Sequence, residues 1–214
     1  MSISCVVTTI AGADDADTRG NLYTCGGSYA QRGWVLRNVM LPWLHSMDVF
    51  DRLVVAGEWE TGPEFVYAPR CQVYHDIKDI LLQRQAGFEA TTGEANDWVL
   101  YLNDDTIWCP ENPVPQPGEP HGVLSPSRWT RARTSHAEPL PDGEGKFVQW
   151  HATLVKRKVT VRVPWSAFPD VLGPDGMHHF DLQFTDILEQ AQIPWRYAPE
   201  YKVWDLEMGG SPWR

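Results

Sequence analysis

Long apolar runs are missing from this sequence: it has no stretch of 18 or more apolar residues, and no basic segment followed by an apolar one at its start. A transmembrane helix needs about 20 apolar residues, so we expect no membrane span, no secretory signal and a cytoplasmic protein. Cysteine is also scarce, and none of the four cysteines belongs to a Cys-x-x-Cys pair. This spacing favours reduced thiols over a disulfide framework or a zinc site.

Positive charge is in short supply, with 18 Lys and Arg residues against 28 Asp and Glu residues and a net charge of -10. That balance argues against a protein that binds nucleic acid without sequence preference. The distribution is uneven, because residues 128–162 hold 8 basic and 3 acidic side chains. This basic strip, residues 128–162, would either contact a phosphate-bearing acceptor such as DNA or form the solvated face of a strand pair.

The chain of 214 residues suits one α/β domain with a sizeable core. In its first half, short β-rich apolar runs alternate with segments of helical periodicity, which predicts a mostly parallel sheet with helices on its faces. The expected strands there are 2–10, 52–57, 64–69 and 99–102, and the expected helices are 29–47 and 77–92, the second ended by Gly93. Later in the chain we expect a proline-rich connector at 110–120, strands at 122–127 and 147–163, and a helix at 178–191.

Two adjacent carboxylates follow the strand expected at 99–102. Asn103, Asp104 and Asp105 lie at its C-terminal end, and ligands of open α/β sheets bind at the carboxyl ends of the strands. Neighbouring carboxylates repel each other unless a positive group lies between them, and a divalent metal that carries nucleotide phosphates is a common solution. A solvated acidic turn is the alternative for these three residues.

Residues 81–108 resemble the nucleotide-sugar-binding core of GT-A fold glycosyltransferases, especially the family 2-like enzymes. That family shows an Arg-Asn-x-Gly helix, an Ala-x-Gly element and a strand ending in Leu-Asp-x-Asp, and residues 84–87, 90–93 and 102–105 fall on these elements. The resemblance implies an α/β, GT-A (Rossmann-like) fold, with a mostly parallel central sheet flanked by helices and a smaller antiparallel C-terminal part. It also implies a single domain over 1–214, with a nucleotide-sugar-binding half at 1–109 and an acceptor-binding half at 121–214.

The resemblance further implies a Mn²⁺ or Mg²⁺ ion. Asn103 stands where the family has the first aspartate of its metal motif, so Asp105 becomes the principal ligand, helped by Asp104 or by water. Residues 202–205 resemble the late strand at which the family often places a further metal ligand, usually a histidine. Asp205 stands there instead, and its carboxylate oxygen suits either metal.

A nucleotide site is implied around the same strand end. The expected nucleotide-binding residues are Thr8, Thr9, Glu58, Asp76, Arg84, Asn103 and Asp104. Arg84 would hold the base or the diphosphate, and Glu58 and Asp76 would hold the nucleobase edge and the ribose; each could instead be an ordinary solvated side chain. In the acceptor half, tryptophans would either stack on the acceptor or pack in the core, namely Trp129, Trp150 and Trp165.

An inverting transfer needs a general base for the acceptor hydroxyl. Residues 180–188 resemble the family's acidic helix start that carries this base, but Phe180 stands where the family often has an acid. The base is therefore Asp181 or Asp186, and Asp181 would also suit a helix N-cap. A retaining enzyme would need no such base, so the sequence favours inversion and leaves the stereochemistry open.

These features together predict a metal-dependent glycosyltransferase that moves a hexose from a UDP- or GDP-sugar to a hydroxyl acceptor. The acceptor would be a polymer such as modified DNA or a protein, and no membrane partner is expected. One alternative is a non-catalytic nucleotide- or sugar-binding relative, favoured by Asn103 and Phe180. Another is a haloacid dehalogenase-type phosphatase, which is disfavoured because its second motif acid would fall on Thr106.

Overall fold

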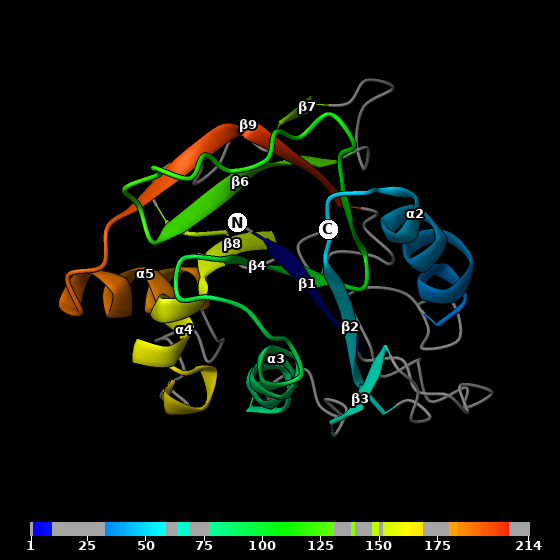
Figure 1. Cartoon of the computed structure of the whole chain (residues 1–214), viewed down its shortest axis with the longest axis horizontal. Helices are drawn as coiled ribbons and strands as arrows, with labels where there is room; N and C mark the ends of the chain where they lie inside the picture. The colour runs from blue at the N-terminus through cyan, green and yellow to red at the C-terminus, as the bar shows by residue number, and fades with distance from the viewer. Residues whose placement is uncertain are drawn as a thin grey trace, which may run out of the picture.

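The computed structural model describes residues 2–9, 33–58, 64–68, 78–130, 138–139, 147–149, 152–168 and 180–205. These residues form a mixed α/β fold around one sheet of nine strands, in the order β3-β2-β1-β4-β8-β6-β9-β5 with β7 paired to β6 (Figure 1). The predicted fold class is confirmed: the sheet is mostly parallel, is flanked by helices and has an antiparallel part toward the C-terminus.

Four parallel strands form the first half of the sheet. They are β1 (Ile3–Thr8), β2 (Arg52–Gly57), β3 (Phe65–Tyr67) and β4 (Trp98–Asn103). β1 lies between β2 and β4, and Thr8 at the end of β1 pairs with Asn103 at the end of β4. The two strands therefore end side by side, at what is called here the C-terminal edge of the sheet.

The second half of the sheet is mixed. β8 (Ala152–Lys156) runs antiparallel to both β4 and β6 (Val123–Thr130), so β6 and its parallel neighbour β9 (Trp195–Asp205) also end toward the C-terminal edge. The two-residue strand β7 (Glu138–Pro139) pairs antiparallel with β6. β5 (Thr106–Trp108) follows β4 closely and pairs antiparallel with β9. The residues after β4 are thereby brought to the end of β9.

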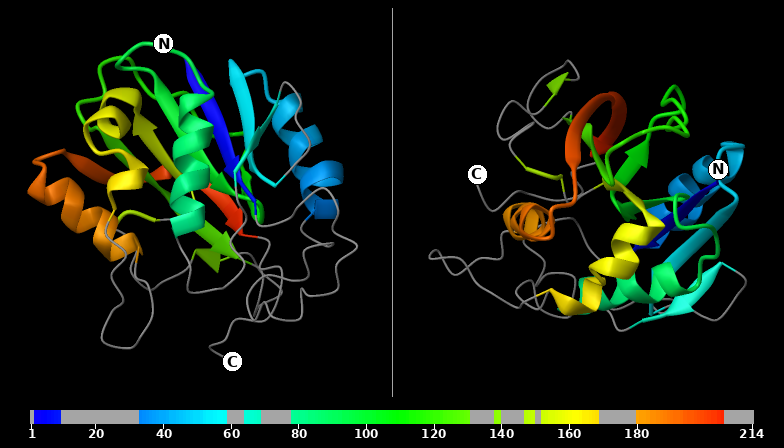
Figure 2. Two further views of the ribbon diagram at one scale, coloured as in Figure 1. Left: turned by 90° about the horizontal axis from the view of Figure 1, so that it is seen from below. Right: turned by 60° about the vertical axis from the view of Figure 1, so that its left-hand side comes forward.

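Helices cover both faces of this sheet (Figures 1 and 2). On one face lies α2 (Leu41–Ser46), which continues a π-helical turn over Leu36–Met40. On the other face lie α3 (Lys78–Glu89), α4 (Arg157–Arg162) and α5 (Phe180–Gln190). The helices predicted at 29–47, 77–92 and 178–191 are thus present within the described residues.

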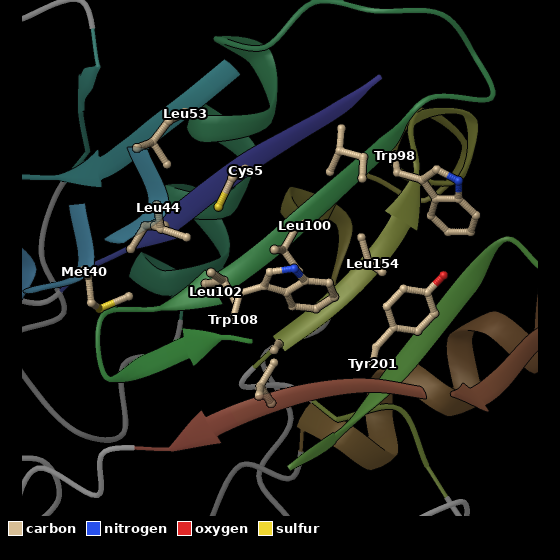
Figure 3. Close-up of a cluster of buried hydrophobic side chains, with 14 of the residues drawn as sticks. Cys5, Met40, Leu44, Leu53, Trp98, Leu100, Leu102, Trp108, Leu154 and Tyr201 are labelled. Atoms are coloured by element: carbon tan, nitrogen blue, oxygen red, sulfur yellow. The ribbon is translucent and has the colours of Figure 1, made fainter. Parts of the chain in front are cut away.

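β1, β4 and β8 are buried almost from end to end because helices cover both faces of the sheet there. Alternate residues of β4 point to opposite sides, so Leu100 packs with Met40 and Leu44 near α2, whereas Tyr101 packs with the residues of α3 and α5. Figure 3 shows the first of these two cores, in which Trp108 of β5 lies beside the β4 side chains. This double burial fixes the register of β4 and hence the position of its polar end.

α3 approaches β1 closely at Gly87. A Cβ atom at this position would lie only 2.3 Å from Cγ1 of Val6, so no larger residue fits without a shift of the helix. α3 ends at Glu89, before Gly93, and the prediction that Gly93 ends the helix is wrong. Gly93 lies in the following loop with φ +149°, a backbone conformation that side chains with a Cβ rarely adopt.

The strand predicted over 147–163 is shorter in the structure. β8 ends at Lys156, and α4 begins at the next residue. The backbone N–H groups of Arg157 and Lys158 each donate a 2.9 Å hydrogen bond to the loop before β4, which turns the chain away from the sheet. Valine recurs at every second position from Val159 onward, and this alternation resembles a strand although the segment is helical.

The predicted proline-rich connector at 110–120 is attached to β9 at two points. The Asn112 side chain accepts a hydrogen bond from the Lys202 N–H at 2.6 Å and donates one to the Lys202 carbonyl oxygen at 2.8 Å. Nearer the other end, Glu119 accepts a hydrogen bond from Arg196 at 3.0 Å.

In the described part of the chain, no helix combines the length and the apolar character needed to cross a membrane.

Candidate functional site

Polar side chains gather where β1 and β4 end side by side. The Thr8 hydroxyl lies 3.3 Å from the Leu102 carbonyl oxygen and 3.4 Å from Asn103 Oδ1. The next residue along each strand makes a similar pair, since the Thr9 hydroxyl donates to Asp104 Oδ2 at 2.8 Å. Thr9 and Asp104 are almost fully buried, so this hydrogen bond fixes the Asp104 carboxylate. Both threonines therefore order the end of β4.

Two consecutive side chains of α3 reach the same strand ends. Gln83 Nε2 donates to the Thr9 carbonyl oxygen at 3.0 Å, and Arg84 Nη2 donates to Asn103 Oδ1 across 3.4 Å. Both side chains are fully buried. The sequence motif predicts a role for Arg84 but not for Gln83, whose only signal in the sequence is its place beside Arg84. The close packing at Gly87 brings both residues to the strand ends.

Aromatic rings enclose the Arg84 guanidinium. Its Cζ atom lies 5.1 Å from the centre of the Trp165 ring and 5.5 Å from that of Tyr101, which suits cation–π attraction. Burial lowers the pKa of Arg84 to about 9, and the neighbouring Tyr101 and Asp181 oppose this shift electrostatically. Arg84 is thus a buried cation at neutral pH next to the strand ends. Trp165 is buried as well, so of its two predicted roles, stacking on the acceptor or packing in the core, the second holds.

Asp181 lies near Arg84, in the first turn of α5. Phe180 is the first residue of α5, so Asp181 is inside the helix and not at its N-cap, where its charge still interacts favourably with the helix dipole. Its carbonyl oxygen accepts a 2.6 Å hydrogen bond from the Thr185 hydroxyl. Asp186 is exposed and lies five positions later, about 140° around the helix from Asp181. The structure therefore separates the two predicted bases, and Asp181 is the one that acts electrostatically on Arg84.

Asp105 and Asp205 reach neighbouring positions through the pairing of β5 with β9. Asp105 precedes Thr106, and Thr106 is the register partner of Asp205. The Asp205 carboxylate accepts a hydrogen bond from Arg128 Nη2 in a cross-strand ion pair, with 3% of the Asp205 side chain exposed and 21% of that of Arg128. In the sequence Arg128 belongs only to the basic strip, and no local pattern predicts this contact.

A divalent metal that a nucleotide helps to bind stays a prediction for Asp105 and Asp205. Within the described ranges, no three His, Cys, Asp or Glu side chains come together as a metal site. Asp104 accepts the Thr9 hydrogen bond through Oδ2 and Asp205 accepts one from Arg128, so these contacts do not by themselves choose between the carboxylates. Mg²⁺ in nucleotide sites is held by one or two carboxylates together with phosphate oxygens and water, and carboxylates suit Mn²⁺ equally. Two carboxylates are thus sufficient when a diphosphate supplies further ligands.

Of the remaining predicted nucleotide residues, Glu58 lies at the end of β2. The Thr9 N–H donates to the Ala56 carbonyl oxygen at 3.1 Å, so β2 adjoins β1 at the C-terminal edge. Glu58 directly follows β2 and is partly exposed there. Asp76 and Trp150 lie outside the described residues.

The other described basic side chains of the strip 128–162 contact the chain itself. Lys156 Nζ donates to the Glu119 carbonyl oxygen and lies 5.2 Å from the centre of the Trp98 ring. Three further residues donate to Thr91, Asn96 and the Ala191 carbonyl oxygen, namely Arg157, Lys158 and Arg162 respectively. These contacts hold α4 to its neighbours, and the strand-pair interpretation is wrong for α4. DNA binding by the strip stays a prediction.

No protein-family model and no curated protein matches this chain. Among solved structures, the chain is similar to the bifunctional IspDF from Campylobacter jejuni, with 10% identity and a TM-score of 0.44. The match covers 93% of this chain and 50% of IspDF, so this chain spans half the length of IspDF. It is also similar to a glycosyltransferase involved in the glycosylation of the major capsid of PBCV-1 (11% identity, TM-score 0.42, 93% of this chain and 82% of that one). A nucleoside-diphosphate-sugar pyrophosphorylase from Vibrio cholerae RC9 is a third (12% identity, TM-score 0.48, 97% and 96%). The similar structures thus include glycosyltransferases and nucleotidyltransferases, and the likeness concerns the fold alone.

Proposed function

We propose that the chain transfers a sugar from a nucleotide-diphospho-sugar to a hydroxyl acceptor. The observation that supports this function is the convergence of Thr9, Asn103 and Asp104 at the C-terminal edge, held from below by Arg84. Ligands of open α/β sheets bind at this edge. Asp181 of α5 acts electrostatically on Arg84, and its carboxylate is the proposed group for proton transfer.

The donor would lie over the ends of β1, β2 and β4. The nucleotide contacts proposed for it are Thr8, Thr9, Glu58 and Asp76, with Asn103 and Asp104 at the end of β4. Asp105 and Asp205 would hold Mn²⁺ or Mg²⁺, which when bound neutralises charge on the leaving diphosphate. Arg84 is proposed as a positioning residue, because it is wholly buried and bonds to Asn103.

The reaction forms a bond between the acceptor oxygen and the anomeric carbon of the sugar. The bond from that carbon to the diphosphate oxygen breaks, and its electron pair leaves with the nucleoside diphosphate. The Asp181 carboxylate takes the proton of the acceptor hydroxyl as general base, which gives inversion at the anomeric carbon. The acceptor would be a hydroxyl of modified DNA or of a protein, bound by the half at 121–214.

Thermal-shift measurements with Mn²⁺ and a panel of UDP- and GDP-sugars test this proposal. One donor should raise the Tm through mass action, and its slow hydrolysis should release the nucleoside diphosphate and free sugar. Release of pyrophosphate from a nucleoside triphosphate and a sugar phosphate would instead indicate nucleotidyl transfer and would overturn glycosyl transfer. Binding without turnover would indicate a non-catalytic relative, and no response to any nucleotide would contradict the whole proposal.

Two single substitutions link the response to the site. Asp105→Asn removes one proposed metal ligand, so the Mn²⁺-dependent part of the donor stabilisation should disappear. Glu189→Gln removes one negative charge from an exposed position of α5 and should leave the stabilisation intact. An equal loss in both variants would show that the response reflects overall charge and not the site.

A further inference from the structure

The ion pair between Arg128 and Asp205 joins two strands that end at the C-terminal edge. Thr130 is the register partner of Asp205, so Arg128 lies two residues earlier on β6. Alternate residues of a strand point to the same side of the sheet, and the Arg128 side chain therefore reaches Asp205 along a diagonal. This contact places a guanidinium beside one of the two proposed metal ligands.

The two partners are buried to different extents. Only 3% of the Asp205 side chain is exposed, and a carboxylate so buried needs a compensating charge. Arg128 supplies that charge in the ligand-free protein and keeps 21% of its own side chain exposed. On the other side of β9, Thr106 of β5 is the register partner of Asp205, and Asp105 directly precedes Thr106. The ion pair therefore lies next to a second acidic position.

This inference rests on the proposed function. We propose that Arg128 exchanges partners: it pairs with Asp205 in the ligand-free protein and binds the donor diphosphate when a divalent cation occupies Asp205. The planar guanidinium can donate two parallel hydrogen bonds to phosphate oxygens. Arg84 cannot do so, because it is wholly buried and donates to Asn103.

Partner exchange predicts effects of opposite sign on two ligands. Loss of the Arg128 charge removes a competitor for Asp205, so Mn²⁺ alone should bind more tightly. The same loss removes a charged contact to the diphosphate, so UDP or GDP should bind more weakly. A residue that merely holds Asp205 in place would affect both ligands in the same direction, so the two measurements separate the alternatives.

The test compares wild type, Arg128→Ala, Arg128→Gln and Arg162→Ala. Free Mn²⁺ is measured by electron paramagnetic resonance without nucleotide, and UDP, GDP and their monophosphates are titrated calorimetrically at saturating Mn²⁺. Both Arg128 variants should bind Mn²⁺ more tightly and the preferred diphosphate about tenfold more weakly or worse, with a smaller loss for the monophosphate. Arg162 contacts Ala191 on the exposed side of α4, so Arg162→Ala should match wild type in both titrations.

The Gln variant keeps an amide that can donate to Asp205, so it remains informative if Arg128→Ala fails to fold. Unchanged diphosphate affinity in a folded Arg128 variant would overturn the inference. Weaker binding of both Mn²⁺ and diphosphate would overturn it too, because Arg128 would then only shape Asp205. If the variants give either of these results while wild type still binds Mn²⁺ and the diphosphate, the inference fails and the proposed function survives. If wild type binds neither Mn²⁺ nor the diphosphate, the proposed function itself is contradicted.

Discussion

Arg84 Nη2 lies 3.4 Å from Asn103 Oδ1, so α3 holds the last side chain of β4 through a buried cation. Asn103 stands where the glycosyltransferase motif has an aspartate, and an amide accepts the hydrogen bond without neutralising the guanidinium. Asp181 acts electrostatically on this guanidinium and opposes the fall in the pKa of Arg84 that burial causes. Asn103, which first suggested a degenerate site, thus accepts a hydrogen bond from the buried Arg84.

Arg84→Met tests this link. Methionine fills a similar volume but loses the hydrogen bond to Asn103 and the electrostatic interaction with Asp181, so the free energy of unfolding should fall by about 2–4 kcal/mol. Urea denaturation measures this change. In the folded fraction, kcat should fall while donor affinity changes little, since Arg84 positions groups and does not touch the donor. Equal loss of kcat and donor affinity would contradict the positioning role.

Gly87→Ala probes the close approach of α3 to β1. The added Cβ would meet Cγ1 of Val6 at 2.3 Å, so the free energy of unfolding should fall by about 1–3 kcal/mol. Val6→Ala removes the clashing atom, and the double variant should be more stable than the sum of the two single changes requires. Chemical denaturation of all four proteins gives this coupling, and strict additivity would contradict the contact.

The local sequence predicts the first half of the fold well. A parallel strand buried on both faces must be apolar from end to end, so β2 is predicted at its observed bounds and β1 and β4 within two residues. The polar residues that follow such strands must then meet at one edge. For this reason the grouping of Thr8, Thr9, Asn103 and Asp104 follows from the sequence.

Long-range register is not encoded in local patterns, and it accounts for what the sequence analysis missed. Arg128 and Asp205 are 77 positions apart in the sequence, and their contact depends on the pairing of β6 with β9. The alternating valines of α4 predict a strand, whereas the segment is helical and the N–H groups of Arg157 and Lys158 donate to the loop before β4. Such tertiary contacts override local periodicity.

Glu119 should make the stability depend on acid pH. Burial raises its pKa, but hydrogen bonds from Arg196 and His121 outweigh burial and lower the pKa to about 2, from an ordinary value of 4.5. The folded protein thus binds this proton more weakly than the unfolded chain, so the carboxylate stabilises the fold above pH 4.5, and this stabilisation is lost as the pH falls toward 2.

Glu119→Gln should therefore lower the free energy of unfolding by about 1–2 kcal/mol at neutral pH. The difference between wild type and variant should shrink between about pH 5 and pH 3. Urea denaturation across this range measures it, with the exposed Glu189→Gln as the control for loss of one carboxylate. A difference that does not change with pH would show that Glu119 stabilises the fold through packing alone.

The sequence leaves Asp181 and Asp186 open as the base and favours Asp181, and the two occupy different positions on α5 in the structure. Asp181→Asn keeps the size of the side chain but cannot accept the acceptor proton, so kcat should fall by about 10²–10⁴-fold with donor affinity nearly unchanged. Asp186 is exposed on another side of α5, so Asp186→Asn should change kcat by less than about threefold. Steady-state transfer kinetics with the identified donor, together with calorimetric donor binding, measure both effects. Loss of kcat in Asp186→Asn with normal turnover in Asp181→Asn would reverse the assignment, because the proton acceptor would then lie outside the cluster that Arg84 organises.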